Sequence, residues 1–384
     1  MTRGNGGCAL GTTIEVLVIL LGSGGVVAIW QEVLKRRPTQ DATFNQALAN
    51  LNTDRPSIHI GALQELDKLA QDHPQYRQRV VNLICGYLSD TSAAIGLGRT
   101  QASGWHVARD TCQSILAAHL RPPEEPDGNR GSQRGAFWED IDLRLMGATL
   151  HNLDLSGCRV RNAWFNGAVF IGETRFRGAE FYGPAVFENA TFRHDVEFME
   201  TTFANHAWFT NATFSGSAMF GSIYASGRIF AAATFYGNAW FRDASFERAA
   251  LFSGVQFSSR WHAAFESAKF HGSAWFHGAS MVDGLFFGAQ FGDSTGFTHV
   301  KFEKLWFRSA VFRGETQFNE ISSGQYVYLH SASLQANADQ LARCVLPPDW
   351  RLRAAATPGT YTFISAWPDD QNFIGVLMDA PPRP

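Results

Sequence analysis

Residues 176–220 read FRGAEFYGPAVFENATFRHDVEFMETTFANHAWFTNATFSGSAMF, and this stretch decides the fold. Phenylalanine recurs there at alternating intervals of five and six residues, as at Phe176, Phe181, Phe187 and Phe192. Alanine commonly stands two positions before the phenylalanine, which gives the unit Ala-x-Phe. The combined period of eleven residues fits neither the period of a helix nor that of a hairpin strand.

A coil with short sides explains this pattern. Each unit forms one side, with its phenylalanine directed to the axis and its alanine fitted beside it. Four sides make a turn of about 21–22 residues, and turns stack at a strand spacing of about 4.8 Å. Of the 32 phenylalanines, 29 lie between residues 137 and 330. We therefore expect a mainly β rod of about eight or nine turns, roughly 40 Å long.

The repeat resembles the pentapeptide-repeat family, whose usual unit is Ala-(Asp/Asn)-Leu-x-x. Residues 147–150 (GATL) and 152–157 (NLDLSG) are close to that leucine form. Two upstream segments, RPSIHIGALQELDKLAQDHPQYRQRVVNLICGYL at 55–88 and FWEDIDL at 137–143, are similar to membrane-anchored members from actinobacteria. The resemblance implies a right-handed quadrilateral β-helix, the pentapeptide-repeat solenoid, preceded by a transmembrane helix and a small α-helical region. It implies no established activity.

The chain divides into six predicted segments. These are an N-terminal tail at 1–11, a transmembrane helix at 12–34, a helical connector at 39–120, a linker at 121–136, the pentapeptide-repeat β-helix at 137–330 and a C-terminal cap or tail at 331–384. The connector shows apolar residues at three- and four-residue spacing, which predicts short amphipathic helices. Its histidines His73, His106 and His119 are interpreted as solvated or capping residues.

The segment at 12–34 carries the membrane prediction. Val16 to Trp30 contains no charge, and about 20 apolar residues suffice to span a bilayer. Lys35, Arg36 and Arg37 follow, so the positive-inside rule favours a single-pass protein in the cell membrane with a cytoplasmic C-terminal body. A cleaved signal peptide and a buried core helix are the alternatives, and the trailing basic residues disfavour the first.

The repeat weakens at three places. The spacing falters between Phe220 and Phe230 and again between Phe257 and Phe265, where we expect a bulge or a loop. After Phe318 the pattern ends, and a helix-like stretch at 333–344 follows. An apolar end turn needs a cover, and we expect the tail, with residues 361–364, to supply it.

No catalytic, cofactor or metal motif is recognised. The chain has no phosphate-binding loop with its lysine, no metalloprotease motif and no nucleophile elbow. His271 and His277 fall on successive sides of the coil and do not converge. The five cysteines show no paired spacing, so we expect reduced, buried thiols. We therefore predict no enzyme and no cofactor.

Five tryptophans stand out, because each directly precedes an inward phenylalanine and should point outward: Trp164, Trp208, Trp240, Trp275 and Trp306. Exposed tryptophan is enriched at binding hot spots, so these residues form a candidate partner-binding surface. The alternative is that each indole lies along its own face of the coil and covers neighbouring apolar atoms.

These observations favour a membrane-tethered, non-enzymatic scaffold or protein-interaction module. Its expected partners are the lipid bilayer through residues 12–34, an unknown protein and, as a further option, a second copy in a homo-oligomer. The alternative from another class is a DNA mimic that interacts with gyrase, as some pentapeptide-repeat proteins do. The net charge of −3 and pI of about 6.5 fit neither a nucleic-acid binder nor a strongly acidic mimic.

Overall fold

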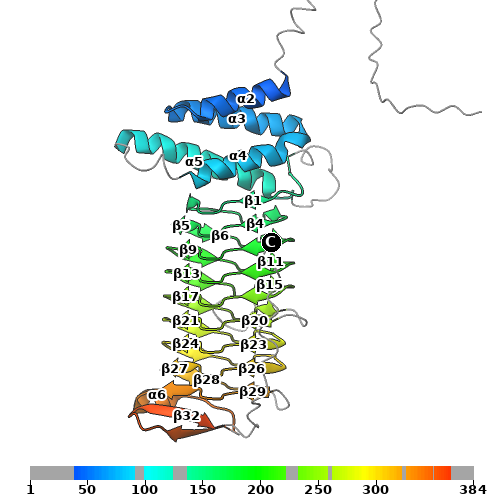
Figure 1. The fold of residues 1–384 in the computed structure, drawn as a ribbon. Coiled ribbons are helices and arrows are strands. Elements are labelled where there is room, and N and C mark those ends of the chain that lie inside the picture. Colours follow the sequence, from blue (N-terminus) through cyan, green and yellow to red (C-terminus); the bar gives the residue numbers. More distant parts are fainter. Residues whose placement is uncertain are drawn as a thin grey trace, which may run out of the picture.

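The computed structural model describes residues 39–90, 99–123, 136–221, 232–257, 262–321, 326–348 and 350–364. Within them, a group of helices covers one end of a four-sided β coil, and a hairpin with a short helix covers the other end (Figure 1). The predicted tail at 1–11 and transmembrane helix at 12–34 lie outside the described residues, as does most of the linker. Within the described ranges, no helix combines the length and the apolar character needed to cross a bilayer.

The helical end contains α2 (Gln40–Leu51), α3 (Pro56–Asp72), a 3₁₀ turn (Pro74–Tyr76), α4 (Arg77–Ser89) and α5 (Arg99–Leu120). Pro56 and Pro74 each occupy a first helical position, where the missing N–H costs nothing. The apolar side of each helix is buried, and these residues share one continuous core with the coil. The helices therefore seal the first turn, as the expected amphipathic pattern requires.

The coil has four faces, numbered in chain order, and its strands pair in parallel with those of neighbouring turns. The first face is the sheet β1 (Leu143–Arg144), β4 (Ala163–Trp164), β8 (Ala185–Val186), β12 (Ala207–Trp208), β16 (Ala239–Trp240), β20 (His262–Ala264), β23 (Asp283–Leu285), β26 (Lys304–Trp306) and β29 (Tyr326–Tyr328). The second face is β2 (Thr149–His151), β5 (Val169–Ile171), β9 (Thr191–Phe192), β13 (Thr213–Phe214), β17 (Ser245–Phe246), β21 (Lys269–Phe270), β24 (Gln290–Phe291), β27 (Val311–Arg313) and β30 (Ser333–Gln335).

The other two faces are shorter. The third is β6 (Thr174–Arg175), β10 (Val196–Glu197), β14 (Ala218–Met219), β18 (Ala250–Leu251), β22 (Ala274–Trp275), β25 (Thr295–Gly296) and β28 (Thr316–Gln317). The fourth is β3 (Arg159–Val160), β7 (Glu180–Phe181), β11 (Thr202–Phe203), β15 (Thr234–Phe235) and β19 (Gln256–Phe257). This arrangement confirms a β-solenoid with a few helices.

The inward phenylalanines stack in columns along the axis. On the first face, the ring centroids of Phe187 and Phe209 lie 4.8 Å apart with planes 1° apart, and the same distance joins Phe209 to Phe241. Both spacings match the distance between paired strands. Phe209 is 0% exposed, and the small residue two positions earlier, Ala207, is also fully buried. The interior of the described coil is therefore packed with aromatic rings, as the sequence predicts.

The five-residue intervals turn a corner with a left-handed residue. Two positions after the inward phenylalanines of the first face, Gly167, Asn189 and Asn211 have φ values of 64°, 57° and 56°. Glycine and asparagine tolerate this conformation better than most residues. The alternation of five and six therefore reflects two kinds of corner in each turn.

A hairpin closes the far end of the coil (Figure 1). β32 (Thr360–Ile364) pairs antiparallel with β30 and with β31 (Arg351–Ala354). Trp350 packs 4.8 Å from the ring of Phe318, and Phe363 packs 5.7 Å from that of Phe312. The helix expected over 333–344 is shorter in the structure, because residues 333–335 continue the sheet and only α6 (Ala338–Arg343) is helical.

Candidate functional site

The interior of the coil leaves little room for chemistry. Its inward phenylalanines are at most 5% exposed, and the polar residues of the described turns lie mainly on the outside. Among the residues that the structure describes, no three His, Cys, Asp or Glu side chains gather closely enough to hold a metal ion. The surface is therefore the place to look for a function.

Four of the five candidate tryptophans lie on one face. Trp164, Trp208, Trp240 and Trp306 belong to the first face, whereas Trp275 belongs to the third. Strand pairing aligns them with apolar residues of the turns between them. We call this aligned set the first-face column; it runs Trp164, Val186, Trp208, Trp240, Ala264, Leu285, Trp306 and Tyr328.

The rings of this column stack on one another along the axis. Trp208 and Trp240 lie 4.9 Å apart at 19°, and Trp306 and Tyr328 lie 3.8 Å apart at 11°. Because their planes lie across the axis, these rings present edges to the outside. Trp208 is 9% exposed and Trp306 is 5% exposed. The expectation that each tryptophan stands out in water is therefore wrong for these two, which cover their own face.

Trp275 on the third face packs against the backbone of the next turn. Strand pairing sets Gly296 opposite it in the next turn. A Cβ built on Gly296 would lie 2.6 Å from the Trp275 ring, so only glycine leaves room for the indole. Trp275 thus follows the alternative interpretation, in which the indole covers its own face, and it does not join the first-face column.

Charged side chains flank the first-face column one position after the inward phenylalanines. This row runs Asn166, Glu188, Thr210, Arg242, Glu266, Phe287 and Arg308, and its four charged residues alternate in sign. Arg242 Nε donates to Glu266 Oε2 at 2.7 Å, and Glu266 is buried under that contact. Arg308 is exposed. The face therefore combines an apolar column with a neighbouring row in which acidic and basic residues alternate, with uncharged residues among them.

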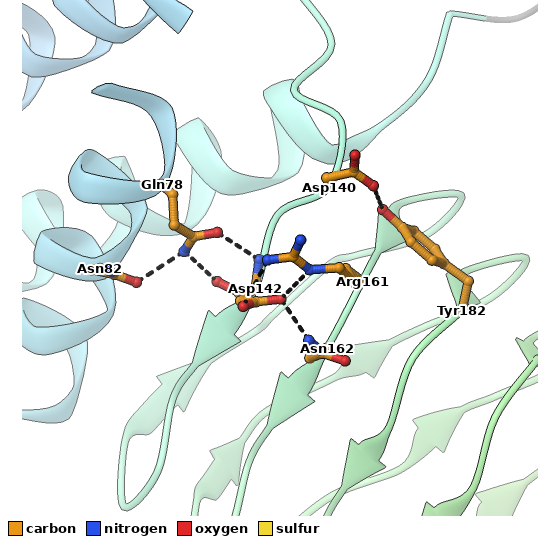
Figure 2. Close-up of polar contacts among 7 residues, drawn as sticks. All are labelled: Gln78, Asn82, Asp140, Asp142, Arg161, Asn162 and Tyr182. Atoms are coloured by element: carbon orange, nitrogen blue, oxygen red, sulfur yellow. Dashed lines mark hydrogen bonds and ion pairs between the residues drawn. The ribbon is translucent and has the colours of Figure 1, made fainter. Parts of the chain in front are cut away.

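A polar cluster joins the helices to the first turns (Figure 2). Asp142 accepts hydrogen bonds from Arg161 Nε at 2.8 Å and Asn162 Nδ2 at 2.8 Å, and its backbone N–H donates to Gln78 Oε1 at 2.8 Å. Gln78 Nε2 donates to the carbonyl of Asp142 at 2.9 Å. Both the carboxylate and the backbone of Asp142 are therefore engaged in contacts that hold the helices to the first turns. We call this cluster the joint.

The ionisation of the cluster agrees with this role. Burial alone would raise the pKa of Asp142, but the hydrogen bonds and charge of Arg161, together with Asn162, lower it overall. Tyr182 donates to Asp140 Oδ1 at 2.8 Å, and burial together with this contact raises the pKa of Tyr182 to about 12. The carboxylate of Asp142 is held charged, and the phenol of Tyr182 is held neutral.

Sequence reasoning missed two further parts of the joint. Arg109 on α5 donates to the carbonyls of Tyr87, Leu88 and Thr149, so one side chain ties α4 to the coil. His119, interpreted as solvated or capping, is buried with one ring nitrogen 2.6 Å from Asp67 Oδ1, so that interpretation is wrong. Neither residue carries a periodic signal, because each is placed by contacts between distant segments.

The described surface includes two hollows lined by polar and charged residues. One of about 300 Å³ lies among α2, α4 and α5, and its cation Arg109 is already committed to the carbonyls above. The other, of about 540 Å³, spans the second and third faces and contains Arg175, Arg193, Arg248, Glu173 and Glu197. Arg175 is bound to Glu173, and the carboxylates of Asp195 and Glu197 line the same hollow. Ser215 and His194 also line the second hollow, where His194 Nδ1 accepts a hydrogen bond from the backbone N–H of Gly172 and is therefore not available to the Ser215 hydroxyl.

The described cysteines are unpaired, as expected. Cys85, Cys112 and Cys158 are buried, and Cys344 is half-buried. Burial raises the pKa of Cys85 and Cys158 to about 12 and raises that of Cys112 further. A thiol held protonated is a poor nucleophile, so these cysteines pack the core.

Comparison with known proteins identifies the repeat. The family model described as pentapeptide repeats (9 copies) matches residues 176–222 and 230–280. No curated protein and no solved structure matches the chain.

Proposed function

We propose that the protein is a non-enzymatic pentapeptide-repeat scaffold that binds other proteins through its first face. The match of the pentapeptide-repeat family model to residues 176–222 and 230–280 supports the family part of this proposal. One observation carries this proposal. The first-face column places eight apolar residues in line over successive turns, whereas the corresponding row of the second face includes Thr191, Thr213 and Ser245. Aromatic side chains in a row of this kind suit a protein interface.

Membrane tethering is part of the proposal. It rests on the uncharged run from Val16 to Trp30 and on the basic residues Lys35, Arg36 and Arg37. α2 begins at Gln40, so the helical end of the rod would lie next to the membrane and the coil would extend from it. We propose that the coil is in the cytoplasm.

DNA mimicry is less well supported than a scaffold. A mimic needs an uninterrupted acidic face. Here carboxylates pair with arginines between turns, as in Arg159–Glu180 at 2.7 Å and Arg177–Glu200 at 2.6 Å. Such pairing neutralises the surface along the rod and favours protein recognition.

Affinity capture from membranes tests the scaffold proposal. We would compare the wild type with the double variant Trp208→Ser and Trp240→Ser. The matched control, Thr213→Ala with Ser245→Ala, changes the outward row of the second face in the same two turns. We expect the tryptophan variant alone to lose its captured proteins while both variants keep the wild-type circular dichroism spectrum. Equal capture by all three proteins would refute the proposal.

A second experiment tests the tether. A C-terminal tag is exposed to protease in intact spheroplasts and in inverted membrane vesicles. Cleavage in inverted vesicles alone agrees with a cytoplasmic coil. Cleavage in spheroplasts would contradict the proposed orientation, and recovery of the whole protein in the soluble fraction would contradict the tether itself.

A further inference from the structure

We propose that the first face binds a second copy of this chain in an antiparallel, two-fold arrangement. This inference rests on the proposed function, since it takes the same first-face column as the interaction surface. It adds the partner and the register. A two-fold dimer brings the same patch of both copies together, so the patch must complement itself. The first face does so in size and in charge.

The geometry leaves two ways to join this face to itself. If the two-fold axis runs parallel to the strands, the strand direction is kept and the order of the turns is reversed. Centred between β16 and β20, this axis sets β16 of one copy against β20 of the other, and each strand further out against its reversed counterpart. If the axis runs along the coil, each strand meets its own copy in the opposite direction.

The reversed register matches large residues with smaller ones. The first-face column alternates irregularly between tryptophan and the smaller residues of other turns. When the column is reversed about the central axis, four pairs of residues face each other, and in three of them a tryptophan faces a smaller residue. The opposed pairs are Trp240 with Ala264, Trp208 with Leu285, Val186 with Trp306, and, at the outermost level, Trp164 with Tyr328. Three tryptophan edges thus meet a shorter side chain, which close packing of two flat faces requires.

The charged row gives an independent match. Because the strand direction is kept, the row one position after the inward phenylalanines faces the same row of the second copy. The reversed register then sets Glu188 opposite Arg308 and Arg242 opposite Glu266. Each pair occurs twice, once on either side of the axis. Arg242 and Glu266 already bind each other within one copy at 2.7 Å, so four charges would meet at the centre.

The other orientation lacks this match. With the axis along the coil, the charged row faces the row that precedes the small residues, so Arg308 approaches Lys304 of the second copy. Trp208 and Trp240 would also meet their own copies, with no smaller side chain to receive them. Like charges opposed across an interface are destabilising, so the antiparallel arrangement is preferred.

A charge exchange tests the register. In the full-length chain, held in a detergent micelle if it is extracted with membranes, Glu188→Arg or Arg308→Glu alone places like charges together at two points. The double variant restores opposite charges at both. By sedimentation equilibrium, we expect each single variant to weaken the dimer at least about tenfold, and the double variant to recover wild-type association. Glu197→Arg, on the third face of the same turn as Glu188, is the control that should associate normally.

The outcomes separate this inference from the scaffold proposal. A monomeric wild type, or a double variant that associates as poorly as the single ones, would overturn the antiparallel dimer. Either result leaves capture of other proteins untouched, because sedimentation uses purified protein alone. Conversely, a wild type that dimerises in this register and captures no other protein would refute the scaffold proposal and support the dimer.

Discussion

Phe209 and Trp208 are neighbours on β12, yet they belong to two different columns. Phe209 points to the axis, is 0% exposed and lies 4.8 Å from the rings above and below it. Trp208 points outward, stacks on Trp240 on one side and meets Val186 on the other. The inner column is nearly uniform, and the outer one is mixed. Uniformity stabilises the rod, whereas the mixture distinguishes the first face from the other three, and we propose that a partner surface recognises this order.

Removing one inner ring should have the largest effect. Phe209→Ala leaves a cavity within a stack of rings that cannot close over it, so we expect a loss of about 3–5 kcal/mol in the free energy of unfolding. Trp208→Ala, in the same strand, loses its stacking and part of its buried area, and we expect about 1–2 kcal/mol. Urea titration followed by circular dichroism measures both. Equal losses would show that the two columns are energetically alike.

A glycine substitution sharpens the comparison on the third face. Gly296→Ala brings a Cβ to 2.6 Å from the Trp275 ring, so the indole must leave the coil surface. We expect a loss of about 1–3 kcal/mol in unfolding free energy and a red shift of the Trp275 fluorescence. Gly278→Ala is not a suitable control, because Gly278 has a φ of 64°. Trp275→Ala in the Gly296→Ala background should remove most of the penalty; if the penalty persists, the indole is not its cause.

The joint around Asp142 gives a prediction that depends on pH. The pKa of Asp142 is lowered in the folded protein, so its contact with Arg161 stabilises the fold above the usual carboxyl pKa of about 3.9. That contribution is lost as the pH falls through the lowered pKa. Asp142→Asn should therefore cost about 1 kcal/mol at pH 7, since Arg161 is 43% exposed, and the difference from wild type should shrink below about pH 4. A difference independent of pH would show that the charge of Asp142 is not involved.

The thiols give the smallest expected signal. Since burial raises the pKa of Cys85, Cys112 and Cys158, these thiols should react with a disulfide reagent at pH 8 only after unfolding. Mass spectrometry of peptides from native and urea-treated protein identifies the modified cysteines. Rapid modification of Cys158 in the native protein would mean that the first turns open beneath α5.

The two columns also differ in how well the sequence predicts them. The inner one follows from spacing alone, because every turn must place a ring at the axis, and Phe176 to Phe220 reveal that rule without other information. The outer column cannot be predicted in this way, because the period determines which face a residue lies on but not how far its side chain is exposed. The sequence therefore predicts correctly that Trp208 and Trp306 lie on the outer side of the coil. It does not predict that they are only 9% and 5% exposed.

The joint between helices and coil was the least predictable part. Arg109, His119 and Gln78 act through partners about 17 to 64 positions away in the chain, and no local pattern marks such contacts. By contrast, the segment at 361–364 was expected at the far end, because an apolar last turn needs a cover. Its Phe363 does pack against Phe312 there.

Site-specific photo-crosslinking tests the central claim, which is that the first face is the interaction surface. A benzophenone side chain is placed at Thr210, beside the first-face column, and in a second protein at Ser215, in the same turn on the second face. Irradiation of cells, followed by mass spectrometry, identifies what each position touches. We predict discrete adducts from Thr210, with the antiparallel dimer giving a link to the second copy near Phe287, and none from Ser215. Adducts from Ser215 with none from Thr210 would contradict the account.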